Sequence, residues 1–243
     1  MMLSGLIASY FLSFKSLSAM SLENKVKVTT NKLKEKYSKT SWDYLFELIL
    51  SSESWSTALH QLISDRQAGE TFFPKFSNIF RSFDLCPLDK IKVVVVAPFP
   101  EETSDGLAFS GGGLNPFTQK INEINKAEGP MVHENKLEYL PKEEGVMLLN
   151  ASLTGLEGKP KNHIPMWKPI IEQMIDQIGY RTTKVVFVFI GEETEHLSKT
   201  VRKGHYKFFL PIWEKPEDAW DANKFFENVN DLLKKIDKEP INW

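Results

Sequence analysis

Four short apolar runs, rich in β-branched and aromatic residues, punctuate the chain from its middle to its end. Each run is bounded by glycine, proline or polar residues, which is typical of strands buried on both faces of a parallel sheet. The runs span residues 91–97, 145–150, 184–190 and 206–211. Elsewhere apolar residues recur at helical spacing and predict helices at 41–50, 56–68, 79–83, 117–126, 167–178, 194–201 and 222–236. This alternation predicts an α/β fold, a three-layer α/β/α domain around a central, mostly parallel four-stranded sheet.

The first apolar run ends abruptly. Residues 92–97 are followed by Pro98 and Pro100, which have no N–H to donate to a neighbouring strand, so the strand ends there. Ligands of open α/β sheets bind just beyond the carboxyl ends of such strands. The side chains at this end belong to Ala97, Pro98 and Phe99, and none of them can act as an acid or a base. The pattern predicts the place of a site but no catalyst within it.

The first 40 residues differ from the rest of the chain. Residues 1–14 carry no charge, and their apolar part is too short to span a bilayer, whereas residues 23–39 hold six lysines. We therefore expect an N-terminal extension over 1–40, apolar and then lysine-rich and flexible, followed by a single domain over 41–243. Residues 1–20 fit either a dispensable extension before Met20 or an organellar targeting segment. The lysine run fits a solvated helix face, a loose arm or a nucleic-acid-binding arm.

Composition narrows the functional classes. An apolar fraction of 42% excludes general disorder, and a net charge of −2 gives the whole chain no general affinity for nucleic acid. The single cysteine, Cys86, excludes a disulfide framework and a cysteine-based zinc site, and it fits an intracellular location. The five histidines form no metal-binding motif, and Gly111-Gly-Gly113 lacks the lysine of a Walker loop. We expect no metal, no cofactor and no membrane span.

Short motifs, taken in order, resemble those of the family 1 uracil-DNA glycosylases. Gly106-Leu-Ala-Phe-Ser110 matches that family's G-L-(A/C)-F-S, and the ten residues from Gly145 to Thr154 match G-V-L-L-L-N-x-x-L-T closely. Weaker matches lie at 65–74, at 162–167, at 189–191 and near the C-terminus, where Pro240-Ile-Asn-Trp243 resembles P-I-D-W. The resemblance covers residues 41–243. It implies the glycosylase fold and an activity that flips uracil out of DNA and hydrolyses its glycosidic bond without a metal.

The resemblance also implies a base pocket. Phe109 would stack on the flipped base, and the amide of Asn150 would read the uracil edge, since it can donate and accept at once. The alternatives are a core aromatic for Phe109 and a strand-end cap for Asn150.

Both catalytic motifs of the family are altered here. With Pro98 set on the proline of G-Q-D-P-Y-H, the water-activating aspartate becomes Ala97 and the tyrosine that blocks thymine becomes Phe99. In the second motif, H-P-S-P-L-S, the histidine position falls on or near Pro211, and Trp213 stands in the region of the leucine wedge. Ala97 and Pro211 are therefore vestigial positions, and we expect no catalytic residue.

Acidic residues also stand where the family faces DNA. The loop after the first strand holds Glu101, Glu102 and Asp105, and residues 214–221 carry four acids against one lysine. Like charges there oppose binding of DNA phosphates, unless one of the acids in the first loop replaces the lost aspartate. Contacts with nucleic acid or a partner would then fall to other residues, for which the candidates are His163, Lys199, Arg202, Lys203 and Trp213.

Three functional hypotheses follow. The first is an inactive glycosylase-fold protein that serves as a binding or assembly subunit. Poxvirus members of the family are also subunits of a DNA polymerase processivity complex, which by analogy suggests viral or phage DNA replication, repair or transcription, in the cytoplasm, the nucleus or a viral factory. The second is an active, divergent glycosylase of base-excision repair. The third is a reader of uracil or of uracil-containing or single-stranded DNA that does not cleave.

Overall fold

The strands of the central sheet are all parallel. The computed structural model describes residues 20–111, 115–128, 137–210 and 222–243. The sheet has the order β3-β2-β5-β6, and its strands are β2 (Val93–Ala97), β3 (Val146–Asn150), β5 (Val186–Ile190) and β6 (Tyr206–Leu210). All four lie within the apolar runs of the sequence, so the predicted strands and the predicted α/β class are confirmed.

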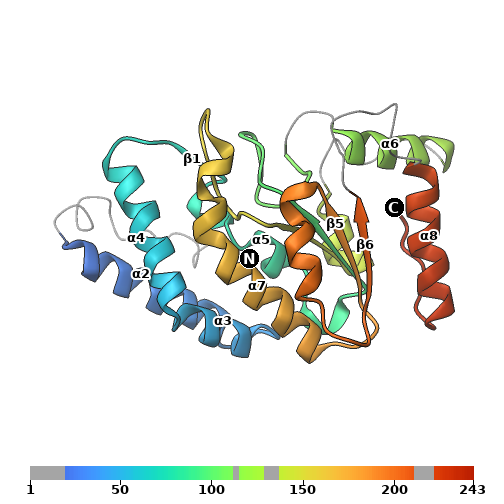
Figure 1. Ribbon diagram of the computed structural model, residues 1–243, viewed down its shortest axis with the longest axis horizontal. Coiled ribbons are helices and arrows are strands. Elements are labelled where there is room, and N and C mark those ends of the chain that lie inside the picture. The colour runs from blue at the N-terminus through green and yellow to red at the C-terminus, as the bar shows by residue number, and fades with distance from the viewer. Residues whose placement is uncertain (1–19, 112–114, 129–136, 211–221) are drawn as a thin grey trace, which may run out of the picture.

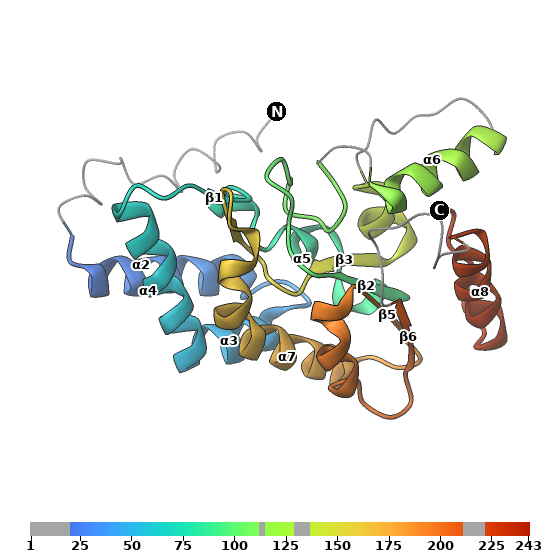
Figure 2. The ribbon, with the colours of Figure 1, turned by 45° about the horizontal axis from the view of Figure 1, so that its top comes forward.

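Helices cover both faces of this sheet (Figures 1 and 2). One core cluster unites the even-numbered valines of β2 with α2 (Leu22–Tyr37), α3 (Asp43–Leu50), α4 (Glu53–Gln67) and α7 (Ile164–Arg181). The other unites Val93, Val95 and Ala97 with α6 (Pro116–Glu128) and α8 (Ala222–Lys235). The short helix α5 (Arg81–Leu85) lies beside β3. Since side chains of a strand alternate between faces, a strand covered on both sides must be apolar throughout, which explains the unbroken valines of β2.

The lysine-rich part of the predicted extension belongs to the folded domain. Residues 22–37 form α2, and the Tyr37 ring stacks on Phe46 of α3 with centroids 3.5 Å apart. The Tyr37 hydroxyl donates to Asp84 at 2.7 Å, and the Trp55 indole of α4 donates to Thr30 at 2.9 Å. Residues 22–37 are therefore a helix that packs on the domain with its lysines outward, which fits the helix-face alternative for the lysine run rather than a loose arm. Only Val26 and Tyr37 of α2 are fully buried, so its apolar periodicity is too weak to outweigh the lysines in the sequence.

Smaller elements connect the layers. A two-stranded antiparallel sheet pairs β1 (Phe72–Phe73) with β4 (Gly155–Leu156), and the segment predicted as an α-helix at 194–201 is the 3₁₀-helix η6 (Glu192–Lys199). The other short helices are η2 (Phe76–Asn78), η3 (Leu88–Lys90), η4 (Leu140–Glu144) and η5 (Pro160–His163). None of the helices in the described ranges combines the length and apolar character that a bilayer span requires.

Candidate base pocket at the carboxyl edge of the sheet

Two adjacent strands end side by side at the edge where the parallel strands finish, called here the carboxyl edge. Ala97, the last residue of β2, is the register partner of Asn150, the last residue of β3. The chain beyond the two strands stays joined, because the amide of Ala151 donates to the carbonyl of Ala97 at 2.7 Å and that of Ser152 to Pro98 at 3.0 Å. Register partners in a sheet point to the same face, so the methyl group of Ala97 and the amide of Asn150 share one wall.

Asn150 carries a polar atom that the protein leaves unsatisfied. Its side chain is 3% exposed, and its Oδ1 has no hydrogen-bond partner among the described residues. A buried, unpaired amide oxygen costs about 1–3 kcal/mol. Such a cost is typical of a group that is kept to meet a ligand or a water molecule rather than to stabilise the fold.

A tight turn brings Phe109 to the same side of the sheet. Phe109 belongs to the same apolar cluster as Ala97 and has a left-handed backbone, with φ of 64°. The turn is anchored to β3, since the amide of Ala108 donates to the carbonyl of Leu148 at 3.4 Å. The Phe109 ring stacks on Phe117 of α6, with centroids 4.7 Å apart and planes 20° from parallel. Ala97 and Asn150 are thus register partners, and Phe109 packs against the apolar cluster that contains Ala97.

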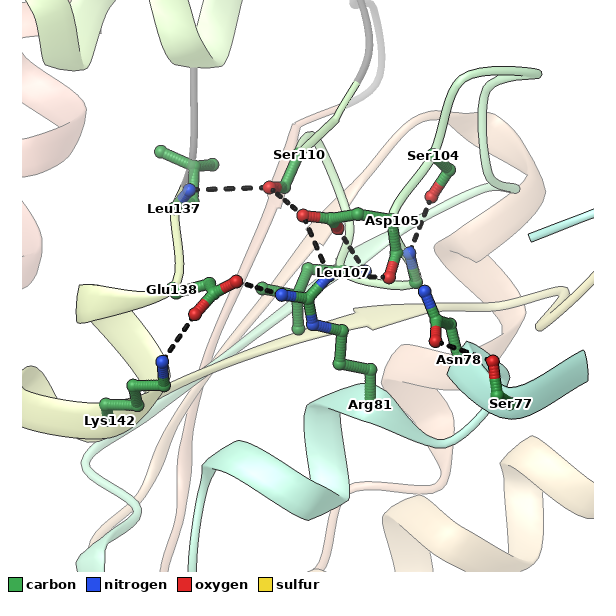
Figure 3. Close-up of polar contacts among 11 residues, drawn as sticks. Ser77, Asn78, Arg81, Ser104, Asp105, Leu107, Ser110, Leu137, Glu138 and Lys142 are labelled. Atoms are coloured by element: carbon green, nitrogen blue, oxygen red, sulfur yellow. Dashed lines mark hydrogen bonds and ion pairs between the residues drawn. The ribbon is translucent and has the colours of Figure 1, made fainter. Parts of the chain in front are cut away.

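Asp105 holds this turn in place through an ionic network (Figure 3). Its carboxylate accepts from the Ser110 hydroxyl at 2.9 Å and from the Leu107 amide at 3.1 Å, and Arg81 lies 3.1 Å away. Arg81 also binds Glu138, which in turn binds Lys142 of η4. The charge of Asp105 is thus compensated by Arg81, and its carboxylate oxygens are used within the turn. This position does not support a role for Asp105 in repelling DNA or in replacing the lost aspartate.

Glu101 is the acid of this loop that is linked to the Phe109 turn. Its Oε1 accepts from the Asn115 amide at 3.5 Å, and the same amide group donates to the carbonyl of Phe109 at 3.1 Å. Glu102 instead accepts from the Gly158 amide at 3.1 Å and so fastens the loop to the segment after β4.

Relatives by sequence and solved structures point to the same fold for this chain. A uracil-DNA glycosylase of Pseudomonas paraeruginosa is 28% identical over 193 residues, which cover 75% of this chain and 84% of the relative. One of Acinetobacter baumannii is 26% identical over 225 residues, which cover 88% and 95%. Mimivirus uracil-DNA glycosylase superposes with a TM-score of 0.71 at 19% identity, over 84% of this chain and 86% of its own. The chain has the uracil-DNA glycosylase fold.

A variant of mimivirus UNG, solved in complex with UGI, superposes with a TM-score of 0.73 at 18% identity, over 84% of this chain and 87% of its own. No protein-family model matches the chain.

Two further predicted site residues of this uracil-DNA glycosylase fold, Phe99 and His163, have partners in other segments of the chain. The Phe99 ring, just past the end of β2, has the ammonium group of Lys161 from η5 5.7 Å from its centroid. His163 is 3% exposed, with Nε2 3.1 Å from Asp65 and Nδ1 2.8 Å from the Thr154 hydroxyl, which also accepts from the Trp167 indole. Burial lowers the pKa of His163, so it is a neutral interior bridge, and this position does not support the contact role predicted for it.

The predicted basic contacts lie towards the opposite side of the fold. Lys199 ends η6, and Arg202 and Lys203 stand in the exposed turn that leads into the start of β6. Arg202 is bound to Asp176 of α7 at 2.7 and 2.8 Å and stacks on Tyr180 at 4.8 Å. These residues are not brought together with the pocket. Pro211 and Trp213 lie outside the described residues.

Sequence reasoning missed three residues that build the pocket. Arg81 and Glu138 are 57 positions apart, and neither carries a motif, so nothing in the sequence signals their ion pair. Asn115 ties Glu101 and the Phe109 carbonyl to α6, and its Oδ1 accepts from the Thr118 amide at 3.0 Å. Asparagine before proline at a helix start is a recognisable cap signal, so this residue could have been found.

Other chemistry is scarce in the part of the chain that the structure describes. No group of three or more histidine, cysteine, aspartate or glutamate side chains gathers there in a way that could hold a metal ion. Cys86 is buried, and burial raises the pKa of its thiol to about 12, so it is no nucleophile at neutral pH.

Proposed function

We propose that this chain is a catalytically inactive protein of the uracil-DNA glycosylase fold that acts as a binding or assembly subunit. The observation that carries the proposal is the end of β2. The resemblance implies a water-activating aspartate at the place of Ala97, whose methyl group stands in register with Asn150. The neighbouring side chains, Val96, Pro98 and Phe99, carry no acid or base either.

The chemistry explains why this loss matters. Hydrolysis of a glycosidic bond places positive charge on the sugar and negative charge on the departing base. A carboxylate and a hydrogen-bond donor stabilise these charges, and the loss of one such group costs about two to three orders of magnitude in rate. Pro211, at or near the family's histidine position, has no side-chain donor either.

An active, divergent glycosylase would need a substitute carboxylate. Glu101 is the candidate that the geometry supports best, because it is exposed and linked to Phe109 through Asn115. Asp105 is bound by Arg81 and by its own turn, and Glu102 is bound to Gly158. The alternative activity therefore depends on one residue, which makes it easy to test.

The test is a uracil-release assay with purified full-length protein, the Glu101→Gln variant and the Ala97→Asp variant, on single-stranded and duplex uracil-containing DNA. We expect no release by the wild type or by Glu101→Gln. Release by the wild type that disappears in Glu101→Gln would overturn the inactive assignment. Release that appears in Ala97→Asp would show that the missing carboxylate is what separates this pocket from an active one.

The proposed binding role is supported by a protein of the same fold that has been solved with a protein partner. A UNG of this fold has been solved in complex with UGI, so its surface supports a protein partner. We extend this to a partner in viral or phage DNA replication, repair or transcription, within the cell. Affinity capture from the native host, with wild type and Ala97→Asp as parallel baits, should retain the same partner on both. A bait that retains nothing beyond an unrelated control protein would count against the assembly role.

A non-cleaving reader of uracil is the second candidate, and the unsatisfied Oδ1 of Asn150 favours it. A base bound between Phe109 and the strand ends would supply the hydrogen bond that this buried oxygen lacks. Phe109 is also held in a left-handed conformation, which costs about 1–3 kcal/mol for a non-glycine residue. Strain of this kind is typical of ligand sites.

Titration with free uracil, uracil-containing DNA and thymine-containing DNA separates the reader from a pure assembly subunit. A reader should prefer uracil, and Asn150→Ala should weaken binding by about tenfold, the loss of one buried hydrogen bond. Affinity that does not depend on uracil or on Asn150 would eliminate the reader. Ser152→Ala is the matched control, since Ser152 is a nearby buried polar residue whose hydroxyl donates to the carbonyl of Thr154.

A further inference from the structure

Three lysine side chains from distant parts of the chain meet at the edge where the parallel strands begin, called here the amino edge. Lys92 precedes β2, Lys184 precedes β5, and Lys238 follows α8. The ammonium group of Lys238 donates to the carbonyl of Ile91 at 3.5 Å and to that of Thr183 at 3.2 Å. These carbonyls belong to the residues directly before Lys92 and Lys184, so Lys238 contacts the backbone next to each of the other two lysines.

The hydrogen bonds that these lysines make to backbone carbonyls are long, and they do not use all of the ammonium N–H donors. Lys92 reaches the carbonyl of Glu239 at 3.4 Å, and Lys184 reaches that of Ile236 at 3.4 Å. Each ammonium group has three N–H donors, and none of the three groups uses all of its donors on these carbonyls. Lys92 and Lys238 are only partly exposed, whereas Lys184 is exposed.

The cluster also has little compensating charge. The carboxylate of Glu144 lies 3.8 Å from Lys92 and accepts the amide of Asn242 as well. The carboxylate of Asp237 lies 4.0 Å from Lys184 and is almost fully exposed. Burial and the charges of Lys92 and Lys184 lower the pKa of Lys238, which agrees with three cations near one another.

We propose that Lys92, Lys184 and Lys238 form a binding site for a phosphate group, either a free phosphate or phosphomonoester or a phosphate of a nucleic-acid backbone. Phosphate has several acceptor oxygens and, in its free forms, up to two negative charges, which suit three converging cations. A single carboxylate would add little to Glu144 and Asp237, which already border the site. The site lies at the opposite edge of the sheet from Ala97 and Asn150, so this proposal does not depend on the function proposed above.

A purely structural clamp is the competing explanation, since the same lysines fasten residues 236–239 to the strand starts. The two explanations differ in their response to phosphate. If the lysines are only a clamp, phosphate at constant ionic strength leaves the stability of the protein unchanged. If they form a binding site, phosphate stabilises the protein because it binds the native state.

The experiment measures the thermal midpoint of full-length protein against increasing inorganic phosphate, with chloride keeping the ionic strength constant. The variants are Lys238→Gln and Lys184→Gln. The control is Lys27→Gln, which removes an exposed charge on α2. A parallel titration follows the anisotropy of a labelled single-stranded oligonucleotide, with inorganic phosphate as competitor.

We expect phosphate to raise the midpoint of the wild type and of Lys27→Gln. Each cluster variant should lose about tenfold or more in apparent affinity, the loss expected for one charge-assisted contact. Response to phosphate alone would identify a free phosphate or phosphomonoester as the ligand, and lysine-dependent oligonucleotide binding would identify a nucleic-acid backbone. Equal responses of the wild type and both cluster variants in the two assays would overturn the proposal. If Lys238→Gln does not fold, an equal response of the wild type and Lys184→Gln is enough to overturn it.

Discussion

The turn that carries Phe109 depends on a residue with no side chain. Gly106 has φ of 101°, and a Cβ atom placed on it would lie 2.1 Å from the backbone carbonyl oxygen of Asn78. Two independent constraints, the backbone conformation and the close approach, therefore require glycine at this position. Because Asp105 and Ser110 close the same turn, a shift at Gly106 is transmitted to Phe109.

Gly106→Ala should lower the free energy of unfolding by about 2–6 kcal/mol, because backbone strain and overpacking each cost about 1–3 kcal/mol. Gly204→Ala is the matched control, since Gly204 has φ of 93° and nothing within 4 Å of the added methyl group. The control should lose only the strain, about 1–3 kcal/mol. Urea unfolding of both variants measures the difference, and equal losses would contradict the close approach.

His163 gives the protein a pH dependence of defined sign. Burial lowers its pKa in the folded state, although Asp65 opposes the shift, so the unfolded chain takes up a proton at higher pH than the folded one. The stability that neutral His163 contributes is complete above about pH 6.5 and is lost as pH falls through the lowered pKa.

The free energy of unfolding should therefore decline below about pH 6.5, and His163→Gln should decline less steeply. His196, whose pKa burial also lowers, is present in both proteins and cancels in the comparison. Denaturant unfolding across this range measures the two slopes. Parallel slopes would show that His163 does not titrate as its burial requires.

At the scale of residues, the sequence could predict the site residues that lie in local motifs. The juxtaposition of Ala97, Phe109 and Asn150 follows from strand ends and from a short motif, both of which are local. The roles of Asp105 and His163 are not local. Each depends on a partner far away in the chain, Arg81 for Asp105 and Asp65 for His163, and charge counting alone made Asp105 a surface acid.

At the scale of elements, α2 shows how a charged helix is held by few anchors. Tyr37 is 1% exposed, stacks on Phe46 and donates to Asp84. Burial and the charge of Asp84 raise the pKa of its phenol well above the ordinary range, so the hydroxyl stays protonated and remains a donor. The helix is thereby part of the core despite its lysines.

Tyr37→Ala should cost about 3–5 kcal/mol of stability, as for other buried aromatics, whereas Tyr37→Phe should cost only about 1–3 kcal/mol for the lost bond to a carboxylate. Lys27→Ala on the exposed face of α2 should change stability by no more than about 0.5 kcal/mol. Thermal or urea unfolding compares the three. An unaffected Tyr37→Ala would mean that α2 is not part of the cooperative unit.

The strands were predictable as elements because an apolar, β-branched run covered on both faces has few alternatives. The helix η6 and the β1–β4 pair were not. Over eight residues, the period of three in a 3₁₀-helix cannot be told from the period of 3.6 in an α-helix, and a two-residue strand has no periodicity. A helix was one alternative for the lysine run, but its packing on the domain gave no signal because its two buried side chains lie eleven residues apart.

At the scale of the whole molecule, the two edges of the sheet have different characters. The carboxyl edge keeps an aromatic side chain and an amide but carries no acid or base on the ends of β2 and β3. The amino edge gathers three lysines around the C-terminal turn. A fold whose relatives are named uracil-DNA glycosylase is here proposed to bind rather than to cleave.

The most direct measurement of this claim is uracil release under single-turnover conditions, with wild-type protein in excess over a uracil-containing single-stranded oligonucleotide. The end of β2 offers no group to activate water, so the account predicts release no faster than from the same DNA without protein. Release well above that background, lost on Glu101→Gln, would contradict the account and assign catalysis to the rim of the pocket.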